Sequence, residues 1–172
     1  MKICVVGLGK LGAPLAAVLA AKGHEVIGID ASPVMVAAIA EGRAPVAEPG
    51  LQDMLDEAQP RLGATGDWHA AVAGADASFI IVPTPSEGDG GFRNDYVIDA
   101  VTRIGRALSP NGGYHVVNIV STVMPGASDG PIRAALEAAS GRIVGVDIGL
   151  TYNPEFIALG SVIRDMLYPD MI

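Results

Sequence analysis

Gly7-Leu8-Gly9-Lys10-Leu11-Gly12 is the stretch of sequence that decides the fold. The spacing GxGxxG is weak by itself, because glycine is common and the pattern is short. Here the stretch directly follows an apolar run predicted as a strand over 2–6, and it opens a predicted helix over 10–22. A strand, a glycine turn and a helix in that order predict a dinucleotide-binding unit.

Each of the three glycines has a specific role in such a unit. Gly7 permits the tight turn, Gly9 lets a pyrophosphate approach the backbone, and Gly12 allows the helix to pack closely on the strand. The free N–H groups and the positive dipole end of the helix then favour a diphosphate. The alternative is an ordinary helix entry with incidental glycines.

Short β-rich runs alternate with helical patterns along the whole chain. This alternation predicts an α/β fold, a Rossmann-type doubly wound, mostly parallel sheet, in one domain over residues 1–172. The expected strands are 2–6, 25–29, 62–65, 77–82, 114–119 and 143–149. The expected helices are 10–22, 33–41, 50–58, 67–73, 95–108, 127–139 and 160–166.

Local signals refine these elements. Leu11, Leu15, Val18 and Leu19 lie at the spacing of one helix face and predict the side that packs on the sheet. Asp95 is the expected N-cap of its helix. Residues 109–113 (SPNGG) predict a stop and a turn, and residues 88–91 (GDGG) predict an exposed loop.

Composition excludes several classes of function. The chain has 172 residues, half of them hydrophobic, and a net charge of −8, which disfavours a nucleic-acid surface. It contains no uncharged apolar stretch of 18 residues, so we expect no membrane span. Its three histidines lack metal-ligand spacing, so no metal is expected. Cys4, the only cysteine, is predicted to be an inert core thiol in a reducing, cytoplasmic protein.

Asp30 ends the second predicted strand, 18 residues after Gly12. A carboxylate at this place can accept hydrogen bonds from the ribose hydroxyls of adenosine, and it repels a 2′-phosphate. No arginine follows in residues 31–35. The sequence therefore favours NAD over NADP, although Asp30 could also cap the helix at 33–41.

Three further segments follow later strands: residues 82–85 (VPTP), 121–126 (STVMPG) and 152–156 (YNPEF). The carboxyl ends of parallel strands line one crevice in an open sheet. Gly7, Thr84, Thr122 and Glu155 are therefore expected to converge on one ligand. Taken singly, each has an ordinary explanation, such as a proline that terminates a strand.

Taken in order, these segments resemble the UDP-glucose/GDP-mannose dehydrogenase family. Residues 48–51 (EPGL) and 153–156 (NPEF) are more specific than the glycine pattern, and residues 167–169 (LYP) extend the resemblance almost to Ile172. The resemblance implies a four-electron oxidation of the C6 alcohol of a UDP- or GDP-sugar to a uronic acid, with two NAD used in turn. It also implies that this chain is the N-terminal part of a larger enzyme.

The family pattern assigns roles by position. The resemblance implies that a cysteine captures the sugar aldehyde, that the adduct is oxidised to a thioester (an acyl-enzyme), and that the thioester is then hydrolysed. Thr122 would hold a water, and Glu155 would contact substrate and act as general base in this hydrolytic step. The family's catalytic cysteine lies in a later domain, and its dimer forms through a long central helix, so the 172 residues alone are expected to be inactive. The expected cofactor-binding residues are Gly7, Leu8, Gly9, Lys10, Leu11, Gly12, Asp30, Pro83, Thr84, Ser121 and Thr122. The expected substrate-binding residues are Tyr152, Asn153, Glu155 and Phe156.

Two positions depart from the family pattern. Ile157, Ala158 and Leu159 stand where many members have Leu-Arg-Glu, whose acid contacts NAD, and Met35 replaces a basic residue. These changes leave open the details of the NAD contacts and the identity of the nucleotide sugar. The alternatives are a domain of the 3-hydroxyacid and 6-phosphogluconate dehydrogenase type and a non-catalytic NAD-binding module.

Overall fold

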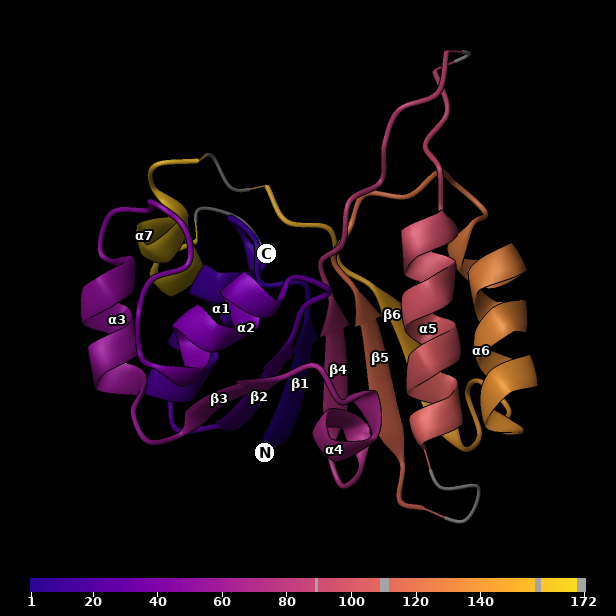
Figure 1. The fold of residues 1–172 in the computed structure, drawn as a ribbon. Helices are drawn as coiled ribbons and strands as arrows, with labels where there is room; N and C mark the ends of the chain where they lie inside the picture. The colour runs from indigo at the N-terminus through magenta and orange to yellow at the C-terminus, as the bar shows by residue number, and fades with distance from the viewer. Residues whose placement is uncertain (89, 109–111, 157–158, 170–172) are drawn as a thin grey trace.

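A single six-stranded sheet forms the centre of the molecule (Figure 1). The computed structural model describes residues 1–88, 90–108, 112–156 and 159–169. The strand order is β3-β2-β1-β4-β5-β6, and every neighbouring pair is parallel. The strands are β1 (Lys2–Val6), β2 (Glu25–Ile29), β3 (Leu62–Thr65), β4 (Ala77–Ile80), β5 (His115–Ile119) and β6 (Ile148–Tyr152).

Helices connect successive strands, as parallel pairing requires. They are α1 (Gly12–Ala21), α2 (Pro33–Ala40), α3 (Leu51–Ala58), α4 (Trp68–Val72), α5 (Asp95–Ala107), α6 (Arg133–Ser140) and α7 (Val162–Leu167), and a wide turn, η1 (Ser128–Ile132), precedes α6. The chain thus forms the expected doubly wound fold, and most predicted elements differ from the observed ones by one or two residues at their ends.

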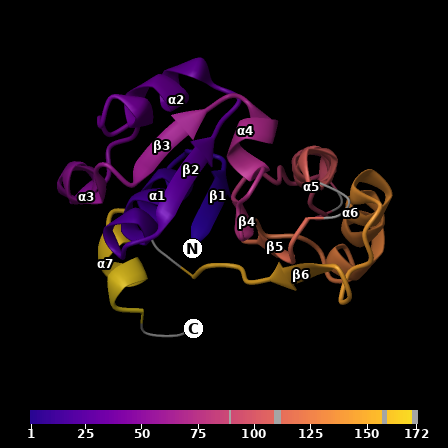
Figure 2. The same cartoon turned by 90° about the horizontal axis from the view of Figure 1, so that it is seen from below.

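Helices cover both faces of the sheet (Figure 2), and the buried side chains form two separate cores. One core packs α4, α5 and α6 against inward residues of the strands, such as Val6, Ile80 and Ile119. The other packs α1, α3 and α7 on the opposite face, against Ile3 and Val5. The alternating residues of β1 enter both cores, which explains why the central strand reads as an unbroken apolar run.

Helix α1 packs on the sheet through small residues rather than through the leucines predicted from its periodicity. Its buried residues are Gly12, Ala13, Pro14, Ala16, Ala17, Val18 and Ala20. Leu11, Leu15 and Leu19 are only partly buried. Small side chains let the helix axis approach the strands closely, so the alanine face lies inward and the leucines flank it.

Three predicted elements are wrong in detail. The helix predicted over 127–139 begins as α6 only at Arg133, because the wide turn η1, with non-helical backbone at Gly130, precedes it. The last strand is β6 at Ile148–Tyr152, whereas we predicted 143–149; Gly145 has a φ of 90° and turns the chain before the strand begins. The N-cap of α5 is Asn94, and Asp95 instead forms an ion pair with Arg93. Of the predicted turn at 109–113, residues 109–111 lie outside the described residues, as does residue 89 of the predicted loop.

The chain reverses its winding direction between β1 and β4, the strands that separate the two halves of the sheet. In doubly wound sheets the crevice at this position, beyond the carboxyl ends of the strands, is where ligands bind. No helix in the described part of the chain is long and apolar enough to cross a membrane.

Candidate functional site

A crevice of about 740 Å³ lies at the switch point between β1 and β4. It brings together the glycine turn, the end of β2, the end of β4 and the start of α5. Its lining residues are Val6, Gly7, Gly9, Lys10, Leu11, Gly12, Ile29, Asp30, Ala31, Trp68, Ile81, Val82, Pro83, Tyr96, Asp99, Ala100 and Leu159.

The glycine turn has the geometry that its three positions predict. Gly7 has a φ of 95°, and a Cβ at Gly12 would lie only 1.8 Å from the carbonyl oxygen of Gly7. The turn and the first residue of α1 are therefore in direct backbone contact. A Cβ at Gly9 would meet no protein atom within 4 Å. Gly9 thus leaves open space on the crevice side, which a pyrophosphate can fill.

The amino end of α1 provides an electropositive wall. The first N–H groups of a helix have no partner within the helix. Among the described residues no side chain caps this end, and its first turn carries no acidic residue. Lys10 is exposed beside it. Backbone donors and a lysine ammonium therefore face one side of the crevice, which suits a phosphate group.

The carboxylate of Asp30 is fixed at the end of β2. One oxygen accepts the N–H of Leu8 at 2.7 Å, and the other accepts the N–H of Ser32 at 2.8 Å. Leu8 is itself fully buried and is absent from the crevice lining, and its backbone N–H orients Asp30. Each carboxylate oxygen retains a lone pair, and Asp30 lines the crevice, so it can accept ribose hydroxyls.

Three aromatic or charged lining residues were not named in the sequence analysis: Trp68, Tyr96 and Asp99. The Arg103 guanidinium lies 5.5 Å from the centre of the Trp68 ring, and Arg103 also pairs with Asp99 at 2.8 Å. Trp68 begins α4 three residues after β3 ends, so its place at the carboxyl edge could have been inferred. Leu159 also lines the crevice, at the position where the family resemblance has an NAD-contacting acid.

The segment that follows β5 is hydrogen-bonded to a residue that lines the crevice. The Ser121 hydroxyl donates to the carbonyl oxygen of Val82 and accepts the N–H of Val82, both at 2.8 Å. Ser121 is buried, and this pair of bonds ties β5 to the residues that follow β4. Thr84 and the exposed Thr122 are absent from the crevice lining and lie further along the same sheet edge.

The residues predicted to bind substrate follow β6, at the far end of that edge. Tyr152 lines a separate hollow of about 450 Å³ with Met124 and Pro125, and its hydroxyl accepts the N–H of Val123 at 3.5 Å. Asn153 is exposed and Glu155 is half-buried. Phe156 is 76% exposed. The predicted cofactor and substrate residues thus follow strands at one edge of the sheet, but only Tyr152 of the substrate residues lines the second hollow.

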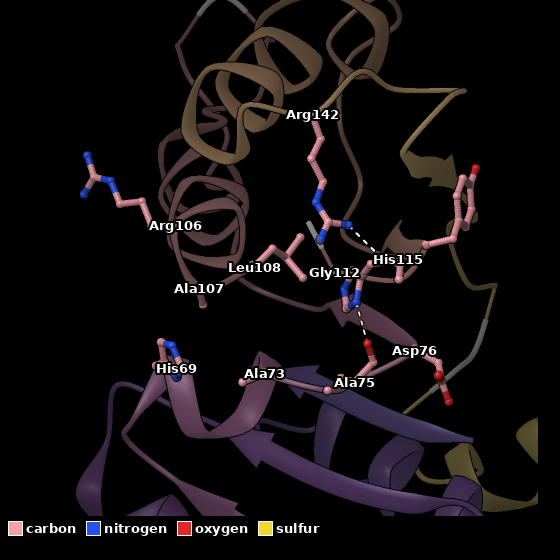
Figure 3. Close-up of a pocket in the computed structure, with 13 residues that line it drawn as sticks. His69, Ala73, Ala75, Asp76, Arg106, Ala107, Leu108, Gly112, His115 and Arg142 are labelled. Carbon is pink, nitrogen blue, oxygen red and sulfur yellow. Dashed lines mark hydrogen bonds between the residues drawn. The ribbon is translucent and has the colours of Figure 1, made fainter. Parts of the chain in front are cut away.

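A further hollow of about 570 Å³ lies at the opposite, amino edge of the strands (Figure 3). Arg142 and His115 point into it. His115 is almost fully buried, with Nδ1 at 2.8 Å from the carbonyl oxygen of Ala75 and Nε2 at 3.0 Å from the Ser78 hydroxyl. Arg142 donates to the carbonyl oxygen of Gly113 at 2.8 Å. These bonds join adjacent loops, so both side chains have structural roles.

Cys4 fits the role of an inert core thiol. It is fully buried in β1, and burial raises the pKa of the thiol to about 12, with a smaller opposing effect from a hydrogen bond to Ser78. A protonated, inaccessible thiol is not a nucleophile. The described residues include no group of three acidic, histidine or cysteine side chains that could hold a metal.

The fold, the glycine turn and the oriented Asp30 together define a Rossmann-type dinucleotide-binding domain. The sequence matches the UDP-glucose/GDP-mannose dehydrogenase family, NAD binding domain, over residues 1–172, and the chain belongs to this family.

Known relatives agree with this assignment. GDP-mannose 6-dehydrogenase of Pseudomonas aeruginosa is 39% identical over 99% of the chain and 40% of its own length. UDP-glucose 6-dehydrogenase of Haloferax volcanii is 36% identical over the whole chain and 40% of its own length. A crystal structure of a ternary complex of GDP-mannose dehydrogenase from P. aeruginosa superposes with a TM-score of 0.94 at 38% identity, over 98% of this chain and 39% of that one. The chain therefore spans about two fifths of these relatives.

Proposed function

We propose that the crevice is the NAD site of an enzyme that oxidises the C6 alcohol of a nucleotide sugar to the carboxylate. The observation that carries the proposal is the arrangement of the open Gly9 face, the amino end of α1 and the oriented Asp30 around one crevice. Bound NAD supplies the hydride acceptor. The overall reaction converts one primary alcohol, one water and two NAD⁺ to one carboxylate, two NADH and three protons.

The residues of the crevice bind and orient the cofactor. The N–H groups at the start of α1 and the Lys10 ammonium face the pyrophosphate. The Asp30 carboxylate accepts the hydroxyls of the adenosine ribose, and the same negative charge repels the 2′-phosphate of NADP. Pro83 and Leu159 line the crevice with apolar surface, which limits the access of water.

Thr122 and Glu155 act at the neighbouring end of the sheet edge in this proposal. Thr122 holds a water molecule and Glu155 accepts its proton during the hydrolytic step. Tyr152, Asn153 and Phe156 contribute to the surface that contacts the nucleotide sugar. Cys4 has no part in this chemistry, because it is buried and protonated. We expect the whole protein to work as a homodimer or larger oligomer in the cytoplasm.

The full-length protein provides the test. Purified enzyme should form two NADH per sugar oxidised, followed at 340 nm, with one nucleotide sugar among GDP-mannose, UDP-glucose and UDP-N-acetylhexosamines. Both GDP- and UDP-sugars must be offered, because the relatives at 39% and 36% identity differ in substrate. If the enzyme binds NAD but forms NADH with none of these sugars, the proposed reaction is contradicted.

A variant separates the proposed role of Glu155 from simple substrate placement. Glu155→Gln keeps the shape of the side chain and removes the base, and the loss of a general base costs about 10²–10⁴ in rate. The variant should give a burst of NADH followed by slow turnover, with acyl-enzyme visible by intact mass spectrometry. A slower burst without acyl-enzyme would assign Glu155 to alcohol oxidation or to substrate placement.

A further inference from the structure

The segment Glu48-Pro49-Gly50-Leu51 lies outside the crevice, and no step of the proposed reaction uses it. Its acid nevertheless makes two specific contacts with a distant part of the chain. The Glu48 carboxylate accepts the N–H of Val162 at 2.8 Å through one oxygen and the N–H of Gly160 at 3.1 Å through the other. More than 110 residues separate the partners in sequence.

These bonds secure the start of α7. The first N–H groups of a helix need acceptors from outside the helix, and a carboxylate is the strongest acceptor that a side chain offers. Ser161, the residue at the N-cap position of α7, directs its hydroxyl to Asp165 and not to the backbone N–H groups. Glu48 therefore caps α7 from a different part of the chain.

Apolar packing reinforces the same attachment. Ile163 of α7 is 8% exposed and packs in the core that contains Leu51 and the small residues of α1. In Figure 1, α7 lies beside α1 and α3 at the level of the carboxyl ends of the strands. Two residues thus attach α7 to the rest of the domain: Glu48 through hydrogen bonds and Leu51 through the shared core.

Leu159 connects this attachment to the crevice. It directly precedes Gly160, the first residue that Glu48 holds, and it lines the crevice together with Gly9 and Asp30. The position of Leu159 therefore depends on where Gly160 and Val162 are fixed. We propose that Glu48 is a positioning residue of the cofactor site: it fixes Gly160–Val162 and thereby seats Leu159 in the crevice wall.

Two variants and a matched control test this inference, which rests on the proposed NAD site. Glu48→Ala removes both acceptors, Glu48→Gln retains one, and Glu57→Ala removes an exposed acid of α3 that lies away from α7. Hydrogen exchange should accelerate at the amides of Gly160 and Val162 in Glu48→Ala and less in Glu48→Gln. The NAD dissociation constant should rise about three- to tenfold in Glu48→Ala, the size expected from the loss of a helix cap.

A double-mutant cycle shows whether Glu48 acts through Leu159. Leu159→Ala should weaken NAD binding, and adding Glu48→Ala to it should weaken binding little further, because the wall is already lost. Additive effects, or faster exchange at Gly160 with unchanged NAD affinity, would overturn the inference. The comparison is made at a temperature at which thermal melts show all variants folded.

The two proposals fail in distinguishable ways. A wild-type chain that does not bind NAD would refute the proposed cofactor site, and the role of Glu48 with it. A wild-type chain that binds NAD, with Glu48→Ala binding it equally well, would refute the positioning role alone. A Glu57→Ala variant that weakens NAD binding as much as Glu48→Ala would also refute it, because the effect would then come from charge and not from the two hydrogen bonds.

Discussion

Replacing Gly12 with alanine tests the contact between the glycine turn and α1. The new Cβ would lie 1.8 Å from the Gly7 carbonyl oxygen, whereas real Cβ atoms essentially never approach another heavy atom within 3.0 Å. Gly12 is buried, and the clash is with backbone, so no side chain can rotate away. The start of α1 must therefore move outward from the turn, which disturbs the packing of Ala13 and Ala16 beneath it.

The expected cost follows from the size of this clash. Overpacking a well-packed site costs about 1–3 kcal/mol, and the contact with backbone puts Gly12→Ala at the upper end. For a domain of 150–250 residues, each kcal/mol lowers the melting temperature by about 2–4 °C. Gly12→Ala should therefore melt about 5–12 °C below the wild type.

Gly9→Ala is the matched control, because it adds the same methyl group three residues away. Its Cβ meets no protein atom within 4 Å, so the free energy of unfolding should change by no more than about 0.5 kcal/mol, as for a surface substitution. The methyl group projects into the space proposed for the pyrophosphate, so NAD affinity should fall sharply. Differential scanning calorimetry and titration calorimetry measure both quantities. A Gly12→Ala protein with wild-type stability, or a Gly9→Ala protein with wild-type NAD affinity, would refute this reasoning.

Three further predictions follow from buried or crevice side chains. Burial lowers the pKa of His115 below its ordinary value of about 6.5; the hydrogen bond to Ala75 opposes this shift, and the charge of Arg142 adds to it. Stability is therefore retained above about pH 6.5 and is lost as the pH falls below it. His115→Gln should flatten this dependence in urea melts between about pH 7 and pH 5. Trp68 is the only tryptophan and lines the crevice near Asp30, so NAD and AMP should change its fluorescence and nicotinamide mononucleotide should not. Cys4, with its raised pKa, should react with a thiol reagent only after unfolding.

Local sequence signals predicted the half of the fold that surrounds the crevice. β1, β2 and β3 were predicted without error at either end, because each is a short run bounded by glycine, polar or turn residues. The glycine spacing and Asp30 predicted the turn and the acid of the crevice, because both depend on residues close in sequence. The roles of Thr122 and Glu155 came only from resemblance and stay predictions.

The errors arose where distant residues decide the conformation. Arg142 is 4% exposed and donates hydrogen bonds to the carbonyl oxygen of Gly113, before β5, and to that of Asp147, in the turn before β6. A buried arginine has no local sequence signature. Leu159 lines the crevice directly before Gly160, whose N–H donates to Glu48, a residue more than 110 positions away in sequence. Helix periodicity also predicted that the leucines of α1 pack on the sheet. The alanines do so instead, because the helix lies close to the strands.

Titration calorimetry of the 172-residue chain with NAD and with NADP tests the central claim most directly. The account predicts saturable binding of one NAD per chain and markedly weaker binding of NADP, because the oriented Asp30 carboxylate accepts ribose hydroxyls and repels a 2′-phosphate. Asp30→Arg should reverse that preference. Equal affinity for the two nucleotides, a preference of the wild type for NADP, or no binding of either would contradict the assignment of the crevice.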